Sequence, residues 1–237
     1  MPNHITSRLK ITGDATKVAE VFNFIKADEP DEKGNYRLFD LEKIVPMPKA
    51  LDIDSFSLGE DGMKYLYSMA GNVLERSAYE KSSHYAYMKD MEMNNPKMFG
   101  KAMEEGKIRL HNIANYGASD WYRWRLLNWG TKWNTYEYRQ IDDNTIEFQT
   151  AWNGIPDMVR LVAEKFPEVT IEYKYADEDW SYNVGSFIFN GEEIEDHSPE
   201  NASPEAWEIV FELGVADRDD FVQQPDGTWE YRDEDED

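Results

Sequence analysis

The stretch from Gly117 to Asn134 reads Gly-Ala-Ser-Asp-Trp-Tyr-Arg-Trp-Arg-Leu-Leu-Asn-Trp-Gly-Thr-Lys-Trp-Asn. It holds four of the eight tryptophans of the chain. Trp121, Trp124, Arg125 and Asn128 recur at helical spacing, which predicts an amphipathic helix that ends at Gly130. Each large aromatic side chain can bury about 150–250 Å², so the cluster favours a packing role. We therefore expect five tryptophans to be mostly buried and to bind a helical insertion to a sheet: Trp121, Trp124, Trp129, Trp133 and Trp152.

On both sides of this stretch the sequence alternates or follows helical periods. Ile5, Leu9 and Ile11 share one face of a predicted strand, and Asp14 is a candidate N-cap for the helix that follows. Asp142-Asp143-Asn144 has the composition of a hairpin turn. The expected strands are Ile5–Thr12, Asn134–Ile141, Thr145–Trp152, Val169–Tyr175 and Tyr182–Phe189, with a short extended piece at Leu38–Val45. The expected helices are Asp14–Ala27, Pro156–Phe166 and a last helix that begins at Ser203-Pro204 and ends at Gly214.

The order of these elements predicts an α+β fold. It is a ferredoxin-like antiparallel sheet, a split βαβ arrangement, of four or five strands with two helices on one face. We expect a single domain over residues 1–191 with a large helical insertion at about 50–129. An acidic C-terminal extension, 192–237, would pack on this domain or trail from it.

Several motifs together resemble a known family. They are Leu9-Lys10-Ile11-Thr12-Gly13 near the start, Lys43-Ile44-Val45-Pro46-Met47-Pro48, Asn128-Trp129-Gly130-Thr131-Lys132-Trp133-Asn134 and Phe148-Gln149-Thr150-Ala151-Trp152. This set is similar to the YubB-type ferredoxin-like family of phage- and plasmid-borne proteins, and it covers about residues 1–190. The resemblance implies a ferredoxin-like fold and a mobile-element origin. It implies no catalytic residue.

The net charge of −23 is concentrated near the C-terminus. From Glu192 to Asp237 there are 18 acids against Arg218 and Arg232, a net of −16. Such a surface repels nucleic acid and anionic membranes and favours basic protein surfaces. The candidate partner-binding residues are Glu192, Glu193, Glu195, Asp196, Asp217, Asp219 and Asp220.

These observations lead to one function with alternatives. We expect a non-enzymatic protein of a mobile element that binds a basic host protein. Its concrete version is an acidic DNA mimic that inhibits a host defence system, of the anti-CRISPR or anti-restriction type. The acidity could instead serve only solubility.

A nucleic-acid or nucleotide-binding module is the second hypothesis. Between Trp121 and Trp133, basic and aromatic side chains interleave as in a base-stacking platform. The candidates are Trp121, Arg123, Arg125, Lys132 and Trp133. The alternative interpretation is that the rings are core and the basic groups pair with acids, which the negative net charge favours.

An enzyme of unrecognised type is the third hypothesis. It ranks behind the other two because no nucleophile, base and orienting group are visible together in the sequence. No histidine pair has metal-ligand spacing, so we expect no metal, cofactor or catalytic residue. The chain has no cysteine and no apolar run long enough for a membrane span. We expect it in the cytoplasm of the host cell, without membrane or direct nucleic-acid binding; its oligomeric state stays open.

Overall fold

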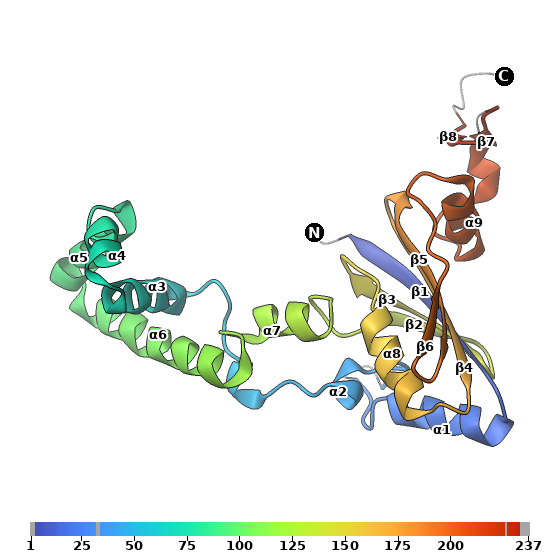
Figure 1. Cartoon of the computed structure of the whole chain (residues 1–237), viewed down its shortest axis with the longest axis horizontal. Coiled ribbons are helices and arrows are strands. Elements are labelled where there is room, and N and C mark those ends of the chain that lie inside the picture. Colours follow the sequence, from blue (N-terminus) through green and yellow to red (C-terminus); the bar gives the residue numbers. More distant parts are fainter. Residues whose placement is uncertain (1–2, 32–33, 226, 233–237) are drawn as a thin grey trace. The chain divides into compact units, whose positions relative to one another are not determined.

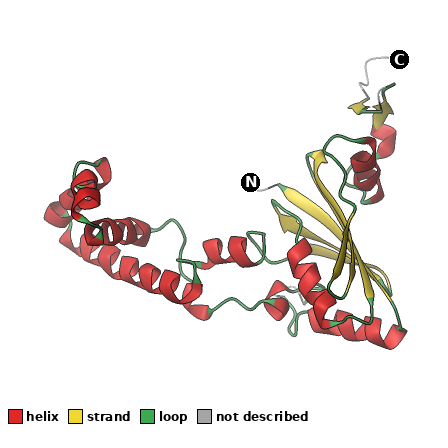
Figure 2. Cartoon of the chain, viewed as in Figure 1, coloured by secondary structure: helices red, strands yellow, loops and turns green. Residues whose placement is uncertain are grey.

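A computed structural model of the protein describes residues 3–31, 34–225 and 227–232. The chain divides into two compact units. The sheet unit comprises Met1–Pro46 and Asn128–Asp237, and the helical unit is Met47–Leu127. All described strands belong to the sheet unit (Figure 2). The helical unit has a hydrophobic cluster of its own.

The sheet unit contains one six-stranded antiparallel sheet in the order β2-β3-β1-β4-β5-β6. Its elements are β1 (His4–Thr12), α1 (Ala15–Ile25), α2 (Leu41–Ile44), β2 (Tyr136–Asp142), β3 (Thr145–Ala151), α8 (Pro156–Lys165), β4 (Thr170–Asp177), β5 (Trp180–Asn190), β6 (Glu193–Asp196), α9 (Pro204–Glu212), η2 (Arg218–Asp220), β7 (Phe221–Gln223) and β8 (Trp229–Tyr231). The first four strands with α1 and α8 form the predicted ferredoxin-like arrangement. The predicted fold class is confirmed.

Alternation along β1 determines which face of the sheet the helices cover. Ile5, Leu9 and Ile11 are completely buried, whereas Lys10 and Thr12 on the opposite face are exposed. Asp14 accepts hydrogen bonds from the first backbone N–H groups of α1, as its position predicts. Helices α1 and α8 cover the face to which these apolar residues point (Figure 1).

Helix α2 replaces the extended piece that the sequence predicts at Leu38–Val45. Its N-terminus is capped by Asp40 and by Asn134, whose Oδ1 accepts from Leu41 N at 3.0 Å. Asp40 is a local cap, but Asn134 lies far away in sequence, so local pattern gives only part of the signal for this helix. The short helix thus depends on a tertiary contact.

The sheet has one strand more than expected, because the acidic segment Glu193–Asp196 is β6. It pairs with β5 through its backbone, while its side chains stay exposed. A charged side chain does not prevent strand pairing when it remains in water, and charges are common on edge strands. The expected C-terminal extension therefore begins inside the sheet. Asp226 and Asp233–Asp237, also part of the extension, lie outside the described residues.

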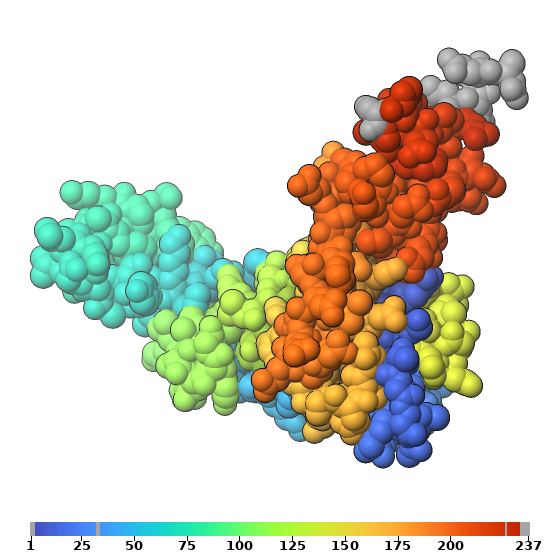
Figure 3. Space-filling model, turned by 45° about the vertical axis from the view of Figure 1, so that its right-hand side comes forward, coloured from blue at the N-terminus to red at the C-terminus, as the bar shows by residue number. Residues whose placement is uncertain are grey.

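Helix α9 packs on the sheet at β4 and β5. Its Trp207 and Val210 form a buried cluster with Ala176 of β4 and Val184 of β5. Ala176 belongs to the face opposite the one covered by α1 and α8, since Tyr173 and Tyr175 alternate with it along the strand. Figure 3 shows this segment, orange to red, on the surface of the sheet unit.

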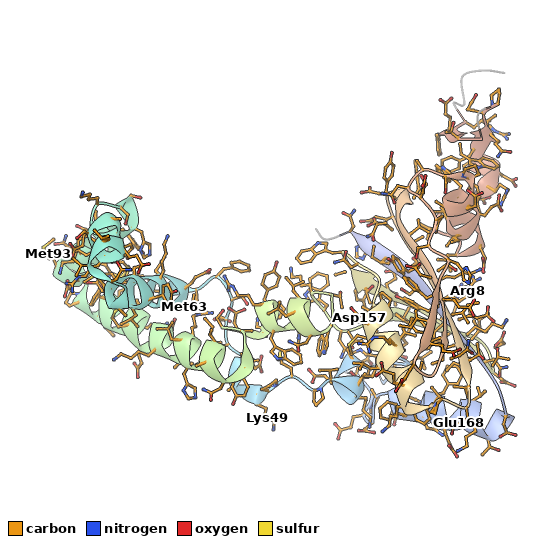
Figure 4. The ribbon with its side chains drawn as sticks, in the orientation of Figure 1. Arg8, Lys49, Met63, Met93, Asp157 and Glu168 are labelled. Atoms are coloured by element: carbon orange, nitrogen blue, oxygen red, sulfur yellow. The ribbon has the colours of Figure 1, made fainter. Side chains whose placement is uncertain are left out.

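The helical unit is built from helices that approach closely. They are η1 (Lys49–Leu51), α3 (Leu58–Ala70), α4 (Val73–Tyr79), α5 (Ser83–Asn94), α6 (Pro96–Tyr116) and α7 (Trp121–Asn128). A Cβ atom on Gly62 would lie 1.8 Å from the carbonyl oxygen of Ala102, so only glycine permits this crossing of α3 and α6. Met63, labelled in Figure 4, follows Gly62 on α3.

A buried ion pair completes the helical unit. Arg109 of α6 donates to Asp120 Oδ2 at 2.7 Å, and both side chains are almost fully buried. Asp120 also accepts from Ser119 Oγ at 2.7 Å and Ser55 Oγ at 3.1 Å. Burial alone would raise the pKa of Asp120, but its hydrogen bonds from Ser119 and Arg123 and the charge of Arg123 lower it.

Candidate functional site

The segment Asn128–Asn134 is held to the sheet unit on one side and exposes side chains on the other. Trp129 is buried and donates from Nε1 to Val45 O at 2.9 Å. Thr131 Oγ1 donates to Ala151 O at 2.9 Å and accepts from Ala151 N at 3.1 Å, so it continues the edge of β3. These inward contacts fix the backbone from which the intervening side chains project.

Lys132 and Trp133 are among the side chains of this segment that reach the surface. The Lys132 ammonium lies 4.6 Å from the centre of the Trp133 ring and 5.3 Å from the centre of the Trp152 ring. Both distances are within the range of cation–π attraction. Trp133 is 36% exposed, and Trp152 is partly exposed.

Trp152 is held in an unusual backbone conformation. Its φ is 74°, in the left-handed region that bulky residues rarely adopt. The backbone is fixed from two sides, since Trp152 N donates to Asn3 O at 2.9 Å and Asn183 Nδ2 donates to Trp152 O at 2.9 Å. The buried carboxylate of Asp177 accepts from Asn3 Nδ2 at 3.1 Å and Asn183 Nδ2 at 3.0 Å, and so ties the two asparagines together.

Tyr136 supports the other ring. It packs edge-on against Trp133, with ring centres 6.1 Å apart. Its hydroxyl donates to Thr150 O at 3.0 Å and lies 2.9 Å from His4 Nδ1, so the single phenolic proton leaves His4 Nδ1–H to act as donor. Burial, and then the negative charges of Glu178 and Glu137, raise the pKa of Tyr136 to about 12. Tyr136 therefore stays protonated at neutral pH and keeps its phenolic proton for the hydrogen bond to Thr150 O.

The basic and aromatic platform predicted from the sequence falls into two parts. Trp121, Arg123 and Arg125 belong to the helical unit, while Lys132 and Trp133 belong to the sheet unit. Arg123 forms ion pairs with Glu60 and with Asp120, the latter at 2.7 Å.

Arg125 lies over the Trp121 ring at 5.1 Å. The interpretation that basic groups pair with acids thus holds for Arg123, and Lys132 contacts tryptophan rings.

The expectation that five tryptophans are mostly buried is only partly correct. Trp124 and Trp129 are buried. Trp121 and Trp152 are half-buried, and Trp133 is exposed. The reason is visible in the contacts, since the exposed rings carry basic side chains on their faces, which remain hydrated at one end.

The predicted acidic residues form two groups within the sheet unit. The β6 group is Glu192, Glu193, Glu195 and Asp196, and the η2 group is Asp217, Asp219 and Asp220. In Figure 1, β6 lies along the edge of the sheet, whereas η2 precedes β7 beyond α9. The structure does not bring the two groups together.

Local contacts use some of these carboxylates. Asp196 accepts from Ser198 N at 2.8 Å, and the hydrogen bonds with Ser198 lower the pKa of Asp196. Glu195 lies 3.1 Å from His197 Nε2. Asp217 accepts from Asp219 N at 3.0 Å and caps η2. For the described part of the chain, no lysine or arginine forms an ion pair with a member of either group.

A charged surface on the second face of the sheet was not predicted. Arg8 of β1, labelled in Figure 4, donates to Glu147 at 2.6 Å and to Glu212 of α9 at 3.3 Å. Lys174 pairs with the same Glu212 at 2.6 Å. Arg8, Lys174 and Glu212 line a cavity of about 300 Å³. The alternation in β1 could have indicated this face of the sheet. The sequence gives no signal, however, that α9 packs on it and supplies Glu212.

Within residues 3–31, 34–225 and 227–232, no three or more histidine, aspartate or glutamate side chains are grouped so that they could hold a metal ion. Over the same described ranges, no helix has both the length and the apolar composition required to cross a bilayer.

The geometry defines a ferredoxin-like α+β domain. Residues 128–217 match the family described as the ferredoxin-like domain in Api92-like protein. The crystal structure of a protein api92 from Yersinia pseudotuberculosis is similar with a TM-score of 0.38 and 9% sequence identity. That likeness covers 84% of this chain and 99% of that one. No curated protein matches the chain.

Proposed function

We propose that the protein is a non-enzymatic interaction protein whose sheet unit binds a basic protein partner. The observation that carries the proposal is the distribution of charge. The helical unit contains eleven basic and eleven acidic residues, so the whole net charge of −23 falls on the sheet unit. A field of one sign over one compact unit steers oppositely charged partners towards it.

The β6 group is the part of this surface best suited to a partner. Its four carboxylates fall within five residues of an exposed edge segment. A strand advances about 3.4 Å per residue, and B-DNA carries one phosphate per about 3.4 Å along each strand. The charge density of β6 thus approaches that of one DNA strand, which supports the more specific proposal of a mobile-element protein that mimics DNA and inhibits a host defence protein.

The charged second face of the sheet favours this proposal over nucleic-acid binding. Arg8, Lys174 and Lys10 would be the natural phosphate contacts of an open ferredoxin-like sheet. Each of them is already paired with a glutamate of the chain, Lys10 with Glu172 at 3.3 Å. A phosphate backbone would have to displace these carboxylates against the net charge of the unit.

The test compares two variants with the same net charge. In the β6 variant, Glu192→Gln, Glu193→Gln, Glu195→Gln and Asp196→Asn are combined. In the control, four exposed acids of the sheet unit outside both groups are neutralised: Glu29→Gln, Asp143→Asn, Asp157→Asn and Glu205→Gln.

Binding is measured by calorimetry against a histone as basic protein and against a single-stranded oligonucleotide, at two salt concentrations. We expect the histone to bind the wild type with salt-dependent affinity. The β6 variant should weaken that binding about tenfold more than the control does. Equal binding by the two variants would reduce the β6 acids to a solubility device. Tight oligonucleotide binding by the wild type would overturn the proposal as a whole.

A further inference from the structure

Trp133 and Trp152 have the arrangement of an aromatic site for a cation. Their rings flank the Lys132 ammonium at 4.6 and 5.3 Å from the ring centres. Within the described residues, no carboxylate lies within 4.0 Å of that ammonium, although this end of the sheet is rich in acids. The lysine is therefore held by ring faces, where any ammonium or guanidinium group of similar size would also be attracted.

The two rings are positioned before any ligand arrives. The left-handed backbone at Trp152 is held by hydrogen bonds from both sides, with Asn3 and Asn183 joined through buried Asp177. Trp133 is supported by Tyr136, whose hydroxyl is itself fixed. A site whose side chains are already ordered loses little conformational entropy when it binds.

The local charge selects the class of ligand. The negative groups that raise the Tyr136 pKa, Glu178 and Glu137, belong to the segments beside the rings. Asp177 adds a further carboxylate, buried and hydrogen-bonded only to amides among the described residues. A phosphate-bearing nucleotide is disfavoured here, whereas a cation gains from both the rings and the carboxylates.

We propose that Trp133 and Trp152 form a cation-binding site that Lys132 occupies in the free protein and that a lysine or arginine side chain of the basic partner takes over. This inference rests on the proposed function and names one of its contact points. Displacement of Lys132 is feasible because its flexible stem can carry the ammonium into water while the incoming cation replaces its ring contacts.

The site is tested first without a partner protein. Tetramethylammonium chloride is titrated into ¹⁵N-labelled protein while the indole N–H signals are followed by NMR, with sodium chloride as the ionic-strength control. Lys132→Ala opens the site, and we expect it to bind tetramethylammonium about fivefold more tightly than the wild type, the effect of one contact with a ring face at a partly exposed position.

A second substitution removes one ring. Trp152→Asn is chosen because asparagine tolerates the left-handed backbone. In the Lys132→Ala background it should abolish the tetramethylammonium response, and Trp133→Ala should do the same. Trp121→Ala in the helical unit is the matched control and should leave the response unchanged. If the double variants respond like Lys132→Ala alone, the two rings do not form the site.

Histone binding by the ring variants distinguishes a failure of the cation site from a failure of the proposed function. We expect Trp133→Ala and Trp152→Asn each to weaken histone binding about two- to fivefold in the wild-type background. Cation binding without an effect of these variants on the histone would overturn the role in partner binding. Absence of histone binding by the wild type, with tetramethylammonium binding intact, would instead refute the proposed function and its partner while leaving the ring site in place.

Discussion

At the scale of single residues, neighbouring tryptophans of similar sequence context have different roles. Trp129 is buried and uses Nε1 to satisfy the carbonyl of Val45, whereas Trp133, four residues later, is exposed. Spacing alone predicted burial for both. The difference follows from Gly130, whose left-handed φ of 75° turns the chain between them.

Trp129→Ala should therefore destabilise the sheet unit strongly. Loss of the buried ring and the cavity left behind should cost about 3–5 kcal/mol of unfolding free energy. The measurement is urea denaturation followed by tryptophan fluorescence, since six of the eight tryptophans lie in the sheet unit. Trp133→Ala is the control, with an expected cost of about 1 kcal/mol or less. Equal losses in the two variants would contradict the assignment of Trp129 to the core.

Asp120 is a buried residue that stabilises the helical unit, as Trp129 stabilises the sheet unit. Asp120→Ala leaves buried Arg109 without its carboxylate, which should cost about 3–5 kcal/mol. Because the folded-state pKa of Asp120 lies below its ordinary value of 3.8, its contribution to stability is present above that pH and is lost as pH falls through the folded pKa.

The measurement is circular dichroism at 222 nm during acid titration. In the wild type the helical signal should be lost at a pH below 3.8. A variant that keeps its helices and the same acid midpoint would show that the ion pair contributes nothing.

At the scale of elements, the sequence predicted those whose signals are local. Helix α1 has its N-cap at Asp14, and the turn Asp142-Asp143-Asn144 joins β2 to β3 as expected. Helix α2 and strand β6 were missed, because α2 depends on distant Asn134 and β6 pairs through its backbone while its side chains indicate a solvated segment.

The candidate site was only half predicted for the same reason. Lys132 and Trp133 were singled out by composition. Trp152 was expected in the core, since neither its φ of 74° nor the support from Asn183 can be read from local pattern. Contacts between residues distant in sequence decide which rings become accessible.

The α3–α6 crossing gives a prediction at this scale. Gly62→Ala should force the two helices apart and lower the unfolding free energy of the helical unit by about 1–3 kcal/mol or more. Gly100→Ala in α6 is the matched control. Nothing lies within 4 Å of its Cβ position, so the better helix propensity of alanine should stabilise α6 by about 0.5–1 kcal/mol. Thermal melts at 222 nm should shift in opposite directions; a shared direction would refute the close crossing.

At the scale of the whole molecule, charge divides unequally between the two units. Like charges on the sheet unit repel one another and oppose its folding, whereas the helical unit has no net charge. Salt should therefore stabilise the two units to different extents.

Raising sodium chloride from about 0.01 M to 0.5 M shortens the electrostatic range from about 30 Å to under 8 Å. The fluorescence-detected melting temperature of the sheet unit should rise by several degrees. The helical signal at 222 nm should move much less. Both signals are measured on the same samples at each sodium chloride concentration. A parallel shift of the two melting temperatures would contradict the division of charge between the units.

The hydrogen bond between Trp129 and Val45 also has a consequence for chain topology. It places side by side the points where the chain leaves the sheet unit and returns to it. Within the helical unit, Asn112 likewise joins the two ends by donating to Ala50 O at 3.0 Å and to Ser119 O at 3.2 Å. A folded helical unit thus acts as a short connection. An unfolded one would become a loop of roughly 80 residues, whose closure costs about 4 kcal/mol of chain entropy. Folding of the insertion therefore lowers the entropic cost of forming the sheet.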